Sequence, residues 1–159
     1  MPGVPALLQP AAHAFQMSVE DCEAAAAQLT LDELWTSPGG VASVGFHLRH
    51  LAGSTDRLLT YARGAQLDAA QRTALAAESA VGDPRPSAGQ LLSAWRAAVE
   101  SAMGQLAATP EKTLADRREV GRAKLPSTVL GLLFHAAEHA SRHTGQVVTT
   151  AKIVASSRR

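Results

Sequence analysis

Three of the six histidines in this chain recur at every fourth residue near its C-terminal end: His135, His139 and His143. A helix turns about 100° per residue, so steps of four keep these side chains on one flank, about 6 Å apart along the axis. Two histidines at this spacing can bind one metal ion, as they do in helical zinc sites. The outer two are about 12 Å apart, so the spacing allows either His135 with His139 or His139 with His143.

A second pair of histidines, His47 and His50, lies in another segment with helical periodicity. On helical wheels, both groups of histidines fall at the border of an apolar face, with His47 slightly more inward than His50. A histidine-rich flank on one helix alone is usually a polar surface, but two such borders could face each other across a cleft. Their neutral imidazoles would suit Zn²⁺, Ni²⁺ or Fe²⁺, and three protein ligands would leave a position for water or substrate.

Two segments around these histidines resemble signatures of the DinB-like proteins, the DinB/YfiT superfamily. Residues 43–54, Ser-Val-Gly-Phe-His-Leu-Arg-His-Leu-Ala-Gly-Ser, resemble the signature of that family's second helix, and residues 132–146 resemble that of its last helix. In the family, one histidine of the second helix and an H-x-x-x-H pair before Gly-Gln bind a metal. By position, the resemblance implies that these ligands are His50, His139 and His143.

The resemblance also implies a fold and an assembly. We expect an all-α, DinB-like four-helix bundle with a long crossover connection, which forms a homodimer and holds one divalent metal ion. Zinc or nickel is the first expectation for this ion, with iron or manganese as alternatives. The wheel favours His47 as the third ligand and the resemblance favours His50, so we interpret His47 as a residue that lines the pocket, with His47 as ligand kept as the alternative.

Other polar residues of the last helix are candidates for the same cleft. His135 could line it, and Gln146 or Glu138 could orient a ligand imidazole through its second nitrogen. Arg142, or Arg49 of the second helix, could bind an anionic group of a substrate. These roles are hypotheses, and the sequence assigns no catalytic residue.

Some DinB-like relatives are transferases or isomerases that use low-molecular-weight thiols, which implies a metal-dependent thiol enzyme acting on a small molecule. A metal ion would lower the pKa of a bound water or thiol. Glu138 is expected to face away from the cleft, so the general base of a metallohydrolase is not evident. The alternative is a stress-associated metal-binding dimer or sensor that catalyses nothing.

Composition places the chain in a broad class. Its 159 residues suit one domain, 1–159, and 46% hydrophobic with only 4% aromatic residues indicates closely packed, alanine-rich helices. A net charge of +1 predicts no nucleic-acid partner, and the single Cys22 allows no internal disulfide. The chain has no apolar run long enough for a membrane span and no positively charged signal start. We therefore expect a cytoplasmic protein that does not enter membranes.

Apolar residues three or four apart predict four long helices. Their expected ranges are about 4–28, 42–63, 87–108 and 127–154, with Ser87 and Ser127 as the N-caps of the last two. Residues 65–86 are least decided and allow a short helix over 68–80. Residues 111–126 predict a connector with a short extended or hairpin-like piece, and residues 155–159 a frayed tail.

Overall fold

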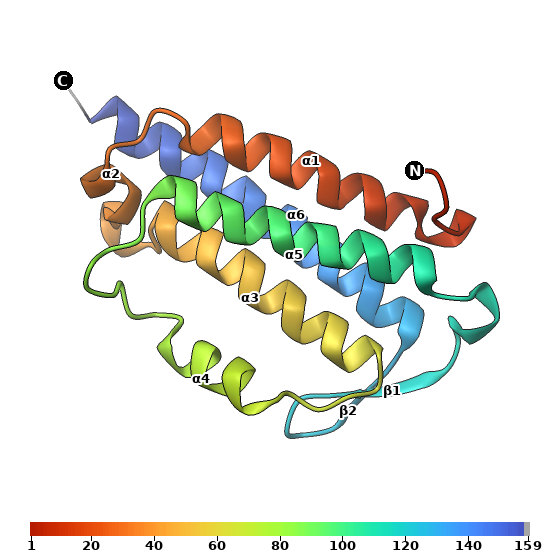
Figure 1. Cartoon of the computed structure of the whole chain (residues 1–159). Coiled ribbons are helices and arrows are strands. Elements are labelled where there is room, and N and C mark those ends of the chain that lie inside the picture. Colours follow the sequence, from red (N-terminus) through yellow and green to blue (C-terminus); the bar gives the residue numbers. More distant parts are fainter. Residues whose placement is uncertain (158–159) are drawn as a thin grey trace.

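Four long helices lie side by side along the molecule (Figure 1). They are α1 (Gln9–Ala26), α3 (Val44–Ala62), α5 (Ala88–Ala108) and α6 (Val129–Ser156). This computed structural model describes residues 1–157. The prediction of an all-α bundle is confirmed, and the boundaries of the four helices differ from the expected ones by a few residues. Part of the tail expected to fray is helical, because α6 continues through Ser156, and residues 158–159 lie outside the described range.

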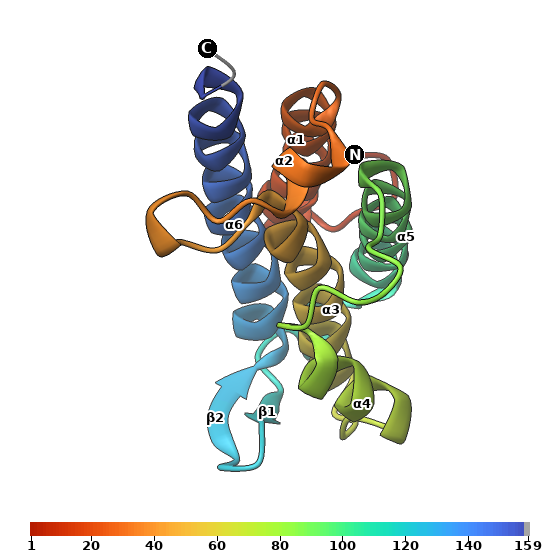
Figure 2. The ribbon, with the colours of Figure 1, turned by 90° about the vertical axis from the view of Figure 1, so that its left-hand side faces the viewer.

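Short elements connect these helices. They are α2 (Leu31–Trp35), α4 (Ala69–Ala77), 3-10 turns at Ala6–Leu8, Pro38–Gly40 and Glu111–Thr113, and the strands β1 (Arg117–Val120) and β2 (Leu125–Thr128). The two strands pair antiparallel, with Arg117 opposite Thr128 and Val120 opposite Leu125. Figure 2 shows this hairpin beyond the start of α6, and α4 beside α3. Both the short helix and the hairpin-like connector were within the expectations from sequence.

Small polar residues set where the helices begin. The hydroxyl of Ser43 accepts the backbone N–H of Phe46 at the start of α3, and Ser87 caps α5 as predicted. The prediction of Ser127 as the cap of α6 is wrong, because Ser127 still pairs with Arg118 in the hairpin. Thr128 caps α6 instead, accepting the backbone N–H of Gly131 at 3.0 Å. The strand thus runs one residue further before the helix begins.

One hydrophobic core lies between the four helices. Helix α6 packs on α1 and α3, and α5 packs on the same two helices from the other side. Fully buried side chains from each helix meet there: Phe15, Leu48, Leu51, Trp95 and Leu133. Cys22 is buried as expected, and burial raises the pKa of its thiol to about 11. No helix within residues 1–157 has the length and apolar character needed to cross a membrane.

The crossover from α3 to α5 carries α4 on the outside of the bundle (Figure 1). Helix α4 has no buried residue of its own. Polar contacts hold it to α3: the Gln71 amide donates to the Asp56 carboxylate and to the Thr60 hydroxyl, each at 2.7 Å. The crossover therefore follows the surface of α3 closely, and its later residues come near the histidines of that helix.

Replacing Gly45 of α3 with alanine should destabilise the fold. A Cβ atom there would lie 2.8 Å from two ring carbons of Trp35. Trp35 cannot easily move, because its indole N–H donates to the Pro86 carbonyl at 2.9 Å. Overpacking of this kind costs about 1–3 kcal/mol of unfolding free energy, which chemical denaturation would measure.

Gly104→Ala in α5 is the matched control for this substitution. A Cβ at Gly104 would meet nothing within 4 Å. Alanine in a helix interior is favoured over glycine by about 0.5–1 kcal/mol, so this variant should be slightly more stable than the wild type. Equal effects of the two substitutions would contradict the close contact between Gly45 and Trp35.

Candidate metal centre

Helices α3 and α6 bring three histidine side chains together. Nε2 of His50 lies 2.9 Å from Nε2 of His139, and the His143 ring centroid is 4.5 Å from the centroids of both other rings. One nitrogen from each residue can be chosen so that all three lie within 4.8 Å of one another. The helical spacing places His139 and His143 one turn apart on α6, and α3 supplies His50 from the facing side. Of the two pairs left open by the sequence, the structure brings His139 and His143 to His50.

This donor set fits a divalent transition-metal ion. Ligands at about 2.1 Å from one ion, at tetrahedral or octahedral angles, are separated by about 3.0–3.4 Å, which is close to the observed spacing of His50 and His139. The three side chains are half-buried, so a cation would be partly desolvated and still reachable from solvent. All three are imidazoles, the ligand type that zinc, nickel and iron share.

His47 lies behind this group. Its side chain is buried, and its Nδ1 is 3.0 Å from Nδ1 of His143. The Phe46 ring contacts His47 edge-on, with centroids 5.5 Å apart, and is nearly parallel to the His50 ring. His47 is thus more inward than His50, as the wheel predicts, and it supports His143 from the core side.

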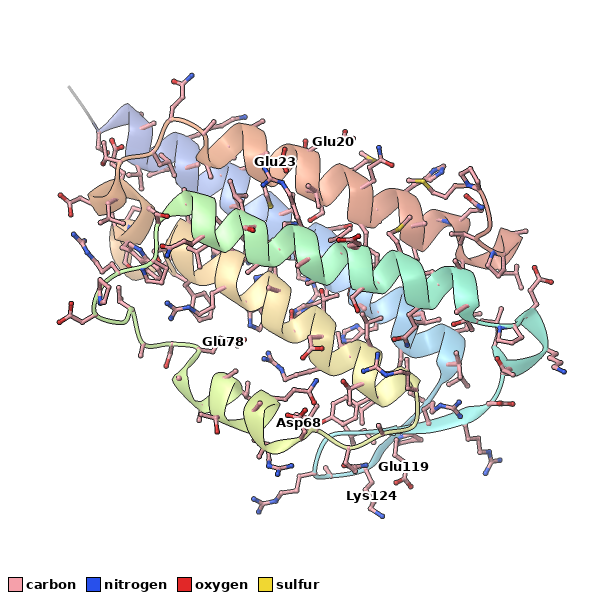
Figure 3. All side chains as sticks on the ribbon, in the orientation of Figure 1. Glu20, Glu23, Asp68, Glu78, Glu119 and Lys124 are labelled. Carbon is pink, nitrogen blue, oxygen red and sulfur yellow. The ribbon has the colours of Figure 1, made fainter. Side chains whose placement is uncertain are left out.

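A buried carboxylate that the sequence did not suggest adjoins the three histidines. Glu78 follows α4 on the crossover (Figure 3). Its Oε2 atom lies 2.7 Å from Nδ1 of His50. Nη1 of Arg57 donates to the other oxygen at 2.9 Å, and Nη2 of Arg57 donates to Oε2 at 3.3 Å. Glu78 and Arg57 are each at most 9% exposed. The ion pair is therefore buried, and one of its oxygens also holds a histidine.

Burial and charge shift the proton equilibria of these groups. Burial lowers the pKa of His143 to about 4, with smaller contributions from the other histidines. Burial, and then His50, lower the pKa values of His47 and His139 below the usual histidine range. Burial alone would raise the pKa of Glu78, but hydrogen bonds from His50 and Arg57 outweigh it and lower that pKa. These shifts favour neutral imidazoles at His47, His139 and His143, and an ionised carboxylate at Glu78, at neutral pH.

The metal-free protein should lose stability as the pH falls from about 6.5 towards 4. The unfolded chain protonates its histidines near 6.5, whereas His139 and His143 in the folded chain take up protons at lower pH. The unfolded state then binds more protons, so the free energy of unfolding decreases as the pH falls across this window, by on the order of 1–3 kcal/mol. Thermal melting of chelator-treated protein at several pH values would measure this slope, and the double variant His139→Gln, His143→Gln should flatten it.

The outer candidates of α6 lie on the exposed side of the site. Glu138 accepts a hydrogen bond from Nε of Arg142 at 3.1 Å and lies 3.5 Å from Nδ1 of His135. The His135 ring is 5.7 Å from that of His139, one turn away from the three converging rings. Gln146 is exposed. The structure therefore places His135 and Arg142 at the rim, and it provides no contact through which Glu138 would orient His50 or His143.

Arg49 of α3 is committed to the crossover. Its guanidinium donates to the Ala80 carbonyl and, at 2.8 Å, to the Val81 carbonyl. It also lies 5.0 Å above the ring centroid of Trp35. With its donors on backbone carbonyls, Arg49 holds the segment that follows Glu78. These hydrogen bonds occupy the guanidinium and compete with the role expected from the sequence, in which Arg49 binds an anionic group of a substrate.

Comparisons with known proteins agree with this architecture. The family model of the DinB superfamily matches residues 14–147. A solved structure described as the crystal structure of the conserved protein of locus from Enterococcus faecalis superposes with a TM-score of 0.77 at 21% sequence identity, covering 94% of this chain and 97% of that chain. At this identity the likeness concerns the fold alone. No curated protein matches the chain.

Proposed function

This chain belongs to the DinB superfamily, and from that membership we propose that it is a divalent-metal-binding protein whose ion is held by His50, His139 and His143. The observation that carries the proposal is the convergence of three imidazoles from two helices, with one nitrogen of each within 4.8 Å of the others. Zinc and nickel suit such a set best, and iron or manganese is the alternative. Three protein ligands leave a coordination position open for water or substrate.

Neighbouring side chains orient these imidazoles and keep them in the neutral form that binds an ion. The Nδ1 atoms of His50 and His143 are engaged by Glu78 and His47, so Nε2 is the nitrogen that each ring would offer to an ion, and Nε2 of His50 faces Nε2 of His139. Neutral imidazoles bind metal, and the lowered pKa values of His139 and His143 keep these rings neutral at physiological pH. When bound, a divalent ion lowers the pKa of a water or thiol at its open position.

We further propose that the open position takes a low-molecular-weight thiol, as in a metal-dependent transferase or isomerase. Three neutral ligands leave both positive charges of the ion uncompensated, which favours an anionic partner such as a thiolate. The two carboxylates near the site are both paired with arginines, Glu78 with Arg57 and Glu138 with Arg142. Neither is free to act as a general base on water, so hydrolysis is the less favoured chemistry.

The second candidate is a non-catalytic metal-binding protein, such as a stress-associated dimer or a sensor. The same pairing of Glu78 and Glu138 supports it, because neither carboxylate is free to transfer a proton. In such a protein the ion stabilises the fold or is the signal that the protein senses. A homodimer suits both candidates, since α1 is rich in alanine and exposes Met17. Sedimentation that gives only a 16.6 kDa species at micromolar concentration would contradict the dimer.

Elemental analysis of untagged protein tests the central proposal. We expect about one divalent ion per chain, in line with one three-histidine site. The metal-loaded protein is then incubated with low-molecular-weight thiols and electrophilic acceptors, and the loss of free thiol is followed. Turnover that stops when the metal is removed supports the thiol enzyme, and a full metal load without turnover favours the non-catalytic candidate. Protein that binds no zinc, nickel, iron or manganese would contradict both.

A further inference from the structure

Glu78 lies at the junction between the crossover and the histidine cluster, and its carboxylate contacts both His50 and Arg57. One oxygen faces Nδ1 of His50 at 2.7 Å, and the other accepts from Arg57 at 2.9 Å. We propose that Glu78 is a positioning residue that fixes the tautomer and orientation of His50, so that Nε2 of this ring points to the ion. The proposal rests on the proposed metal function and goes beyond it, since it assigns a role to the crossover.

The hydrogen bond determines which ring nitrogen carries the proton. An ionised carboxylate can only accept, so Nδ1 of His50 must be the protonated nitrogen. The nitrogen that this hydrogen bond leaves to bind an ion is then Nε2, the atom that is 2.9 Å from Nε2 of His139. A carboxylate behind a ligand histidine also makes its imidazole a stronger donor. Of the three histidines, His50 is the one whose ring lies within hydrogen-bond distance of a carboxylate in the described part of the chain.

Arg57 keeps the carboxylate in place. It lies two turns further along α3 than His50, so both partners of Glu78 project from the same helix. The guanidinium engages both oxygens, at 2.9 and 3.3 Å, and a two-point contact fixes the plane of the carboxylate. The rotation of Glu78 that would release His50 is therefore opposed by Arg57.

The backbone around this pair leaves room for the carboxylate and holds the crossover near it. A Cβ atom at Gly53 would lie 2.6 Å from Oε1 of Glu78 and 2.8 Å from Nη1 of Arg57. Glycine on this face of α3 thus provides the space for the buried pair. Arg49 holds the carbonyls of Ala80 and Val81, just beyond Glu78. The space at Gly53 and the hydrogen bonds from Arg49 together allow the crossover to approach His50 closely.

Metal affinity provides the first test, with Glu78→Gln as the variant and Glu138→Gln as the matched control. Both substitutions neutralise a carboxylate that is paired with an arginine near the site, but Glu138 does not contact His50. Competition with a chromophoric chelator for Zn²⁺ should show affinity lowered about 10–100-fold for Glu78→Gln and unchanged for Glu138→Gln. Equal affinities of the two variants would overturn the proposal.

The tautomer of His50 provides the second test, and it needs no metal. Nitrogen NMR of the histidine rings in the metal-free protein should show His50 protonated at Nδ1 in the wild type. In Arg57→Met, Glu78→Leu, where both charges are replaced by apolar groups of similar size, this preference should be lost while the fold is kept. Wild-type His50 protonated at Nε2, or the same tautomer in both proteins, would contradict the role of Glu78.

The two tests separate this proposal from the proposed function. A wild type that binds no metal would overturn the metal function, while the tautomer measurement would still decide whether Glu78 positions His50. The double variant also separates positioning from folding, because it carries no unpaired buried charge. If it melts like the wild type and binds Zn²⁺ equally well, Glu78 does not position His50 and the proposal is overturned.

Discussion

Replacing His139 or His143 with alanine should abolish stoichiometric metal binding, whereas replacing His135 with alanine should leave the metal content nearly unchanged. His139 and His143 each supply one of the three converging imidazoles, and two remaining imidazoles make a weak site. His135 lies one turn earlier on α6 and has a half-exposed side chain. Elemental analysis of the purified variants, dialysed against metal-free buffer, would measure the difference.

The same variants determine where on α6 the ion is bound. If His135→Ala loses the metal while His143→Ala keeps it, the ion lies one turn earlier and the assignment by family resemblance is wrong. His47→Ala tests the remaining alternative, because His47 contacts His143 from behind rather than from the side of the other rings. We expect this variant to bind metal more weakly than the wild type but still stoichiometrically at saturating metal.

Trp95→Ala should cause the largest loss of stability of any single substitution considered for this protein. The indole is completely buried at the centre of the bundle and packs against Phe15, with ring centroids 6.3 Å apart. Removing a buried tryptophan leaves a large cavity and costs about 3–5 kcal/mol of unfolding free energy. Urea denaturation followed by circular dichroism would measure this cost.

Trp95→Phe is the informative companion to this variant. Nε1 of Trp95 is buried without a hydrogen-bond partner in the described structure, and an unsatisfied buried donor carries a cost of about 1–3 kcal/mol. Phenylalanine removes that donor and keeps most of the packing, so we expect a much smaller loss than for alanine. If phenylalanine destabilises as strongly as alanine, the indole N–H has a partner that contributes to the fold.

The sequence predicted the bundle well because the relevant signals are local. Apolar periodicity determines each long helix, and Ser87 marks a helix start within three residues of the group that it caps. The error at Ser127 arose because Ser127 and Thr128 are both good caps, and the pairing of the hairpin decides between them. That pairing depends on contacts with residues earlier in the chain, which periodicity does not report.

The candidate site was predicted in part, for a related reason. Helical wheels rank side chains by inwardness, and they rank His47 above His50 correctly. Inwardness is not the property that brings a side chain to the cluster, however, since the converging rings lie at the half-exposed border between α3 and α6. Glu78 was missed because it lies in the segment with the weakest pattern, 28 residues from its partner His50. The position of Glu78 depends on the path of the crossover. Gly53, a glycine inside α3, was a local indication that another segment approaches the helix closely.

The polar attachment of α4 has a thermodynamic consequence. A helix that buries none of its residues gains little from the hydrophobic effect, so we expect α4 and the crossover to open locally at a smaller free energy than the bundle. Opening would carry Glu78 away from His50. By linkage, an ion that prefers the closed state must stabilise that state, so metal binding would slow amide hydrogen exchange in α4 although no residue of α4 touches the ion. Hydrogen exchange in α4 would then report whether an ion is bound at the three histidines.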